Sequence, residues 1–233
     1  MNIVGIIGAM DAEIASLKNE LENPRNKTVM GIEFVSGKLE GRDVVVAKCG
    51  MGKVQAAMCA TIMINDFNAA KLINTGVGGA VYQKLLIGDV VVSSDTCLHD
   101  VDLTAIGEPL GKLPNLNTVN FPADKVLIGL AVSAGENVLR EHNVHVGVIA
   151  TGDQFIASKA KKDFIRDNFG AYAADMEGGA IGEVCHLNKI PYVVIRAVSD
   201  NADEAAGGDF MFSVDETAQS SAAIVREMLK NLG

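Results

Sequence analysis

The chain has 233 residues, which suits one large α/β domain, and we expect a single domain over 1–233. Hydrophobic residues make up 48% and charged residues 21%, a balance that excludes a disordered or fibrous chain. The net charge of -9 argues against nucleic acid or an anionic membrane as a partner, because both select clustered Lys and Arg. A small neutral or cationic substrate fits this charge better.

The cysteines Cys49, Cys59, Cys97 and Cys185 are far apart and form no C-x-x-C pair. We therefore expect buried thiols of a reducing cytosol, not a disulfide framework or a zinc site. No apolar run approaches the roughly 18 residues of a membrane helix, and the opening run NIVGII has no basic flank or cleavage site. The sequence thus predicts a cytoplasmic protein.

Short β-branched runs alternate with segments of helical period along the chain. Strands are predicted at 2–7, 71–76, 88–94, 144–152, 171–176 and 191–200, and helices at 12–21, 54–67, 126–142, 159–169, through 186–188 and at 222–232. The more polar stretch 28–48 reads as an antiparallel meander with a turn near Glu40 and Gly41. The continuous apolar runs KLINTG and PYVVIRAVSD suit central strands. This alternation predicts a mostly parallel or mixed sheet between helices.

Unusual residues follow four of the predicted strands: GAMDAE at 8–13, GVGGA at 76–80, ADME at 174–177 and SDNAD at 199–203. In open α/β sheets, ligands bind beyond the carboxyl ends of the strands. If the sheet is parallel there, all four segments meet at one edge. We therefore expect the ligand site at this edge.

The glycines near these strand ends do not indicate a nucleotide cofactor. The pattern at Gly5 and Gly8 is an incomplete G-x-G-x-x-G, and Asp11 and Glu13 would compete with a pyrophosphate for the helix N-terminus. Asp11 is interpreted as a helix cap. The segment TGVGGA is expected to be a loop, either a tight turn or a close approach to a flat ligand, and no P-loop Lys follows it.

The remaining polar residues have simpler interpretations. HDVD at 99–102 could be a metal site, but it lacks further His ligands at helical spacing, so we predict none. We interpret His142, His145 and His186 as surface or capping residues. Arg196 lies within an apolar strand and is expected to form a structural ion pair with one of the acids at the sheet edge.

Seven motifs together resemble one family. GIIGAMDAEI, CGMGKVQAA, INTGVGGA, HDVDLTA, TGDQFI, ADMEGGAI and VIRAVSDNAD occur in this order over most of the chain. They resemble the bacterial 5′-methylthioadenosine/S-adenosylhomocysteine nucleosidases. The resemblance implies a single-domain, three-layer α/β/α fold of the nucleoside phosphorylase type, with a central mixed sheet. It also implies a homodimer without metal or cofactor.

The resemblance assigns roles to three acids. Cleavage of an N-glycosidic bond needs an acid at the purine and an activated water at the sugar, a logic similar to that of paired carboxylates in glycosidases. By position, Asp200 would protonate the purine, Glu13 would activate water and Glu177 would bind the ribose hydroxyls. Asp175 matches a position where relatives carry either acid, or it is only a helix cap.

Other contacts are implied by position. Phe155 would stack on adenine, the Ile156 backbone would bond its edge, and Met176 would offer a polarizable surface. Ser199 can share the proton of Asp200. The rest of the implied substrate-binding set is Ala9, Met51, Val77, Gly79 and Phe210.

The segment 103–114, LTAIGEPLGKLP, departs from the aromatic-rich version of the relatives, in which the partner subunit closes the alkylthio pocket. Here Ile106, Glu108 and Pro109 occupy that region. The preference among methylthioadenosine, S-adenosylhomocysteine and 6-amino-6-deoxyfutalosine is therefore open.

Two rival functions are weighed against hydrolysis. Phosphorolysis needs convergent cations, typically an Arg before the glycine segment, but Asn74 and Thr75 stand there. The presence of all three acids counts against a nucleoside-binding sensor without turnover, because a binder has no use for a protonated aspartate beside an activating glutamate. Hydrolysis is therefore favoured.

Overall fold

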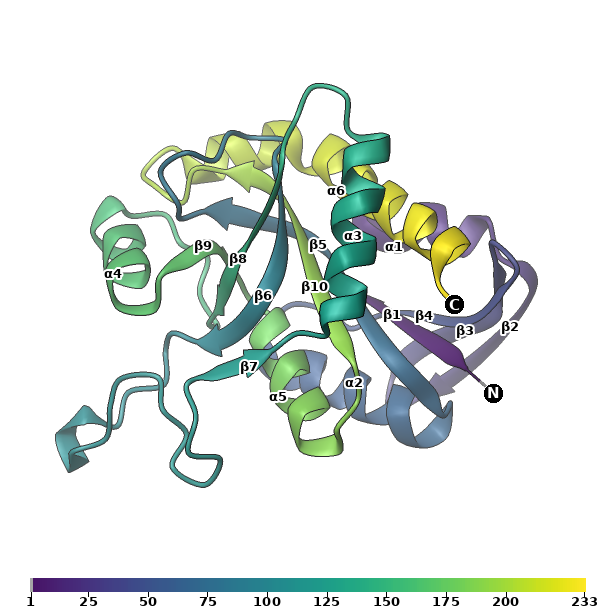
Figure 1. The fold of residues 1–233 in the computed structure, drawn as a ribbon, viewed down its shortest axis with the longest axis horizontal. Helices are drawn as coiled ribbons and strands as arrows, with labels where there is room; N and C mark the ends of the chain where they lie inside the picture. Colours follow the sequence, from purple (N-terminus) through teal and green to yellow (C-terminus); the bar gives the residue numbers. More distant parts are fainter. Residues whose placement is uncertain (1) are drawn as a thin grey trace.

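The computed structural model describes residues 2–233 as one α/β fold with a mixed sheet (Figure 1). The elements are β1 (Ile3–Gly8), α1 (Asp11–Asn19), β2 (Glu22–Val29), β3 (Ile32–Leu39), β4 (Arg42–Lys48), α2 (Lys53–Asp66), β5 (Ala69–Ala80), β6 (Val90–Leu98), η1 (Thr104–Ile106), β7 (Asn120–Pro122), α3 (Lys125–Val138), β8 (Val144–Thr151), α4 (Lys159–Phe169), β9 (Ala171–Asp175), α5 (Gly178–Asn188), β10 (Tyr192–Asp200) and α6 (Ala206–Asn231).

The ten strands form a mixed sheet in which β2, β3, β4 and β1 lead to the central strand β5. β5 pairs parallel with β1 and β10 and antiparallel with β9. β10, β6, β8 and β9 are paired in this order, so these four strands and β5 form a closed ring. The predicted mixed sheet is confirmed, and its closure brings the ends of β5, β9 and β10 together.

Helices cover both faces of the sheet (Figure 1). Helices α1, α3 and α6 pack together on one face, where α6 contacts β5 and β10. Helices α2 and α5 contact each other on the opposite face, and α4 packs on β8 and β9. Burial of apolar side chains between these layers drives the packing. The three-layer arrangement predicted from the sequence is therefore present.

The glycine segment Gly76–Ala80 is a strand, so its prediction as a loop was wrong. β5 continues through it because two neighbours supply backbone partners. β10 pairs Arg196 with Gly76 and Val198 with Gly78, and β9 pairs Ala174 with Gly79. These ladders override the low strand propensity of glycine.

The antiparallel meander was predicted with its turn at the right place. Glu40 and Gly41 join β3 to β4 with φ angles of 48° and 76°, as a two-residue hairpin turn requires. The structure adds β2, an exposed edge strand that pairs with β3.

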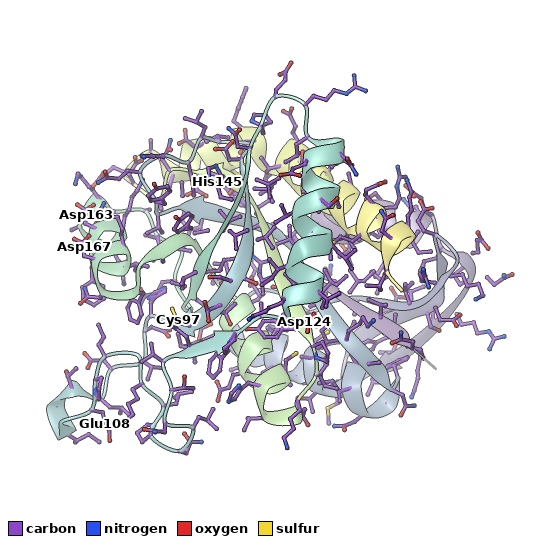
Figure 2. All side chains as sticks on the ribbon, in the orientation of Figure 1. Cys97, Glu108, Asp124, His145, Asp163 and Asp167 are labelled. Carbon is purple, nitrogen blue, oxygen red and sulfur yellow. The ribbon has the colours of Figure 1, made fainter. Side chains whose placement is uncertain are left out.

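The segment between β6 and β7 projects from the body, and Glu108 lies on its protruding part (Figures 1 and 2). The cysteines Cys49, Cys59, Cys97 and Cys185 are free and buried, as expected. No helix within residues 2–233 is long and apolar enough to span a membrane.

Candidate active site

One cavity lies where β1, β5, β9 and β10 end, with about 590 Å³ of empty space including its open mouth. Residues of all four segments singled out in the sequence, 8–13, 76–80, 174–177 and 199–203, line this cavity, which confirms their predicted convergence. Every predicted catalytic and substrate-binding residue lines the cavity: Ala9, Glu13, Met51, Val77, Gly79, Phe155, Ile156, Asp175, Met176, Glu177, Ser199, Asp200 and Phe210.

Sequence reasoning missed four further lining residues, Met10, Gly78, Gln154 and Ala174. Each is adjacent in sequence to a predicted one, and each lies within a segment or motif that the sequence analysis singled out. Arg196 does not line the cavity but lies behind its wall.

Glu13 lines the cavity and is held by backbone amides. Its Oε2 accepts hydrogen bonds from the N–H groups of Ala9 (2.6 Å) and Met10 (2.9 Å), and its Oε1 accepts one from Val77 (3.0 Å). Burial raises its pKa, while the Arg196 charge and these amides oppose the rise. Because it sits at the start of α1, Glu13 also helps to satisfy the amides before that helix.

Asp11 does not cap α1, so that interpretation was wrong. It is the first residue of the helix, and its exposed carboxylate pairs with Lys48 Nζ at 2.6 Å. Glu13 caps the helix instead, because a side chain in the first turn can reach back to the amides before the helix.

Arg196 is fully buried and is surrounded by acids. Its Nη2 lies 2.6 Å from Asp175 Oδ2 and 3.6 Å from Glu177 Oε2, and it donates to Asn74 Oδ1 at 2.6 Å. A buried cation requires such partners. Asp175 also accepts hydrogen bonds from the Gly178 amide (2.9 Å) and the Thr151 hydroxyl. It is therefore both a cap of α5 and the main partner of Arg196.

Glu177 directly precedes α5 at the cavity wall. Its Oε1 accepts a hydrogen bond of 2.9 Å from the Gly52 amide. Burial raises its pKa to about 7; the Arg196 charge works against this rise and the Asp175 charge adds to it. The following glycines are needed for packing, since a Cβ at Gly179 would lie 2.7 Å from the Cys97 carbonyl oxygen.

Asp200 is the last residue of β10 and lines the cavity. Its Oδ1 accepts from the Ala202 amide (2.9 Å), and its Oδ2 accepts from the Ser199 hydroxyl (2.8 Å). Burial raises its pKa, while these two hydrogen bonds oppose the rise. The charges of Asp209 and Asp203 add to the rise.

Aromatic rings form part of the cavity's wall. The rings of Phe155 and Phe210 meet edge to face, with centroids 5.7 Å apart. Phe155 is half exposed, whereas Ile156 is buried. An exposed aromatic face beside a cavity is suited to a flat, apolar ligand surface.

The charges at the site are acidic. The described lining residues include Glu13, Asp175, Glu177 and Asp200 but no Lys, Arg or His. Across residues 2–233, no group of three or more His, Cys, Asp or Glu could hold a metal ion. In the HDVD motif, Asp100 instead pairs with Lys53.

His145 and His186 lie outside the cavity lining. His145 Nε2 is 3.3 Å from Asp89 Oδ2, and the ring of His186 packs on Phe121.

The comparisons agree with this geometry. A model described as phosphorylase superfamily matches residues 3–230, so the chain belongs to that superfamily and has its fold. A 5′-methylthioadenosine/S-adenosylhomocysteine nucleosidase of Psychromonas ingrahamii is 40% identical over 230 residues, which cover 98% of this chain and 99% of that protein. The chain belongs to the 5′-methylthioadenosine/S-adenosylhomocysteine nucleosidase family.

Solved structures show the same likeness. The Neisseria meningitidis nucleosidase in complex with methylthio-immucillin-A has a TM-score of 0.95 and 37% identity and covers 100% of both chains. A Helicobacter pylori futalosine hydrolase has a TM-score of 0.93 and 34% identity, covering 99% of this chain and 98% of that one.

Proposed function

We propose that the protein hydrolyses the N-glycosidic bond of 5′-methylthioadenosine and S-adenosylhomocysteine, releasing adenine and the 5-thioribose product. In this proposal Asp200 protonates the purine, Glu13 activates the attacking water and Glu177 binds the ribose hydroxyls. The observation that carries it is the gathering of these three carboxyl groups, from distant parts of the chain, around one cavity.

The environments of the acids support a division of labour. An acid must hold its proton until the purine leaves, and burial of Asp200 favours the protonated form. A base must be ionised, and the three amides around Glu13 favour its carboxylate. Burial raises the pKa of both carboxyl groups, but the neighbouring charges differ: the Arg196 charge lowers the pKa of Glu13, whereas those of Asp209 and Asp203 raise that of Asp200. This difference fits a base and an acid of a hydrolysis.

Water is the proposed nucleophile because the cavity offers phosphate no free cation. Arg196 lies behind the wall, and its guanidinium is already engaged by Asp175, Glu177 and Asn74. Phosphate ions are bound by convergent Arg and Lys groups, and here acids converge instead.

The test is release of free base by the pure protein from methylthioadenosine, S-adenosylhomocysteine, 6-amino-6-deoxyfutalosine and inosine, each with and without phosphate. We expect adenine from the first two at a rate that phosphate does not change. A phosphate-dependent rate would indicate phosphorolysis, and binding without any release would indicate a nucleoside sensor. The assay with 6-amino-6-deoxyfutalosine shows whether its 5′ substituent is accepted as well.

We further propose a homodimer in which the partner's 104–114 segment closes the alkylthio pocket, and a cytoplasmic location. Ile106 on this projecting segment is 76% exposed, which supports burial against another surface. Buried free thiols are typical of a reducing compartment.

A further inference from the structure

The start of α2 presents two successive amides to two different acids. The Gly52 N–H donates to Glu177 Oε1 at 2.9 Å, and the Lys53 N–H donates to Asp153 Oδ1 at 2.8 Å. The first bond reaches the cavity wall, and the second lies outside it. The direction of the Gly52 amide is therefore coupled to the position of Asp153.

Asp153 is held in turn by a small ionic cluster. Lys53 Nζ lies 2.6 and 2.7 Å from the two oxygens of Asp100 and 3.8 Å from Asp153 Oδ2. The Asp153 amide donates to Asp100 Oδ2 at 3.1 Å. We call Lys53, Asp100 and Asp153 the Lys53 cluster. It links three segments that are far apart in sequence.

The Lys53 cluster is more than an exposed ion pair. The side chains of Lys53 and Asp100 are only 22% and 17% exposed. Burial alone would raise the pKa of Asp100, but the hydrogen bonds from Lys53 and from the Asp153 amide lower it below its ordinary value. A carboxylate that is ionised, partly buried and doubly bonded to one ammonium group is a fixed anchor.

Gly52 makes the arrangement possible. Its φ of 98° is in the region that favours glycine, and a Cβ there would lie 3.0 Å from Asp153 Oδ1. Glycine at this position thus lets the two amides reach their acids.

We propose that the Lys53 cluster is a positioning device for Glu177. None of its members lines the cavity, but Met51 and Gln154, which line it, are close in sequence to Lys53 and Asp153. By fixing the Gly52 amide on Glu177 Oε1, the cluster sets the orientation of the Glu177 carboxylate from one side, while Arg196 lies 3.6 Å from Oε2 on the other. This inference rests on the proposed role of Glu177 in binding the ribose hydroxyls.

The first test is Asp153→Ala against Asp153→Asn. The alanine variant removes the acceptor for the Lys53 amide, whereas asparagine keeps an oxygen there. We expect Asp153→Ala to raise the KM for methylthioadenosine about tenfold or more with a smaller change in kcat, because small misplacements near a site are costly and ribose binding is lost in ground and transition states alike. Asp153→Asn should recover most of this loss.

Asp43→Ala is the matched control, since it removes an exposed acid paired with Lys38 at 3.0 Å, away from the cavity lining. It should leave KM unchanged. Lys53→Met is the second cluster variant; it deletes the ammonium group and keeps the amide. Circular dichroism melts establish whether each variant is folded. If Asp153→Ala is poorly folded, Lys53→Met is used for the test in its place.

Two readouts separate positioning from general damage. Adenine carries no ribose, so calorimetry should give it the same Kd in Asp153→Ala as in the wild type, while the Kd of a non-hydrolysed methylthioadenosine analogue rises. In a Glu177→Gln background, Asp153→Ala should add little further loss. An unchanged KM, an equal loss of adenine affinity, or a full additional loss in the Glu177→Gln background would overturn the inference. Wild-type protein that releases no adenine refutes the proposed function instead, and the calorimetric comparison still decides the positioning role.

Discussion

At the scale of single residues, Asp200 carries the clearest prediction. Asp200→Asn keeps the size of the side chain and a carbonyl oxygen for the Ala202 amide, but it has no proton to give to the purine. We expect kcat to fall by about 100-fold or more while the Kd for methylthioadenosine stays near that of the wild type. Single-turnover rates and calorimetry measure the two quantities. A variant with wild-type kcat would remove Asp200 from the mechanism.

Glu13→Gln tests the water-activating role separately. A glutamine has one acceptor oxygen, so it cannot accept from the Ala9 and Val77 amides at opposite oxygens as Glu13 does. We expect a large loss of kcat, because both the base and its amide cradle are lost. Adenine release at saturating substrate measures it, and an unimpaired rate would mean that the water is activated elsewhere.

Glu177 links the site to stability. Burial raises its pKa from 4.5 to about 7, so between these values the folded state holds a proton that the unfolded state has released. This contribution to the free energy of unfolding is complete below pH 4.5 and is lost as the pH rises through 7. Between pH 5 and pH 7.5, the free energy of unfolding measured with urea should therefore fall less for Glu177→Gln than for the wild type. Equal falls would contradict the raised pKa.

At the scale of elements, β5 must pass unusually close to Glu13. A Cβ at Gly76 would lie 2.3 Å from Glu13 Oε1, which real contacts do not allow. Gly76→Ala should therefore push the carboxylate away from the Val77 amide and reduce activity at least tenfold, with some loss of stability. Gly129→Ala is the control, because open space surrounds that position within α3 and alanine favours a helix. Base release and thermal melts compare the two variants.

Most elements could be predicted from the sequence because their apolar periods are long. The fully buried β10 and the helices α2 to α5 lie where the pattern placed them. The exceptions have local causes. β2 has no buried residue and contains Pro24, so no alternation marks it, and β7 has only three residues. α6 begins at Ala206, well before the part of it that was predicted. The pattern missed the earlier part because it contains glycine and polar residues.

At the scale of the whole molecule, the sequence could predict which residues meet but not how they are held. The convergence at the sheet edge followed from the strand pattern, and the individual acids were assigned by resemblance. The Lys53 cluster could not be predicted from the sequence. Its ion pair joins Lys53 to Asp100, 47 positions away, and the hydrogen bond from the Lys53 amide reaches Asp153, 100 positions away. No periodicity marks such contacts, and they exist only after the loops have packed.

The final prediction concerns the assembly. Val54 on α2 and Leu187 on α5 are 79% and 55% exposed, and these two helices are neighbours on one face of the sheet (Figure 1). Exposed apolar side chains on adjacent helices are typical of an interface. If that face pairs with a second copy, Val54→Glu would place a charge in the contact, and each chain would lose the partner's cover over its alkylthio pocket.

Light scattering should therefore give a dimer for the wild type and a monomer for Val54→Glu. The variant's KM for methylthioadenosine should rise, while its affinity for adenine, which has no alkylthio group, should change less. Val126→Glu on α3 is the matched control, because Val126 is 69% exposed on a helix of the opposite face. It should remain dimeric. A wild-type monomer with full activity would contradict the proposed assembly, because the pocket would then need no second chain to close it.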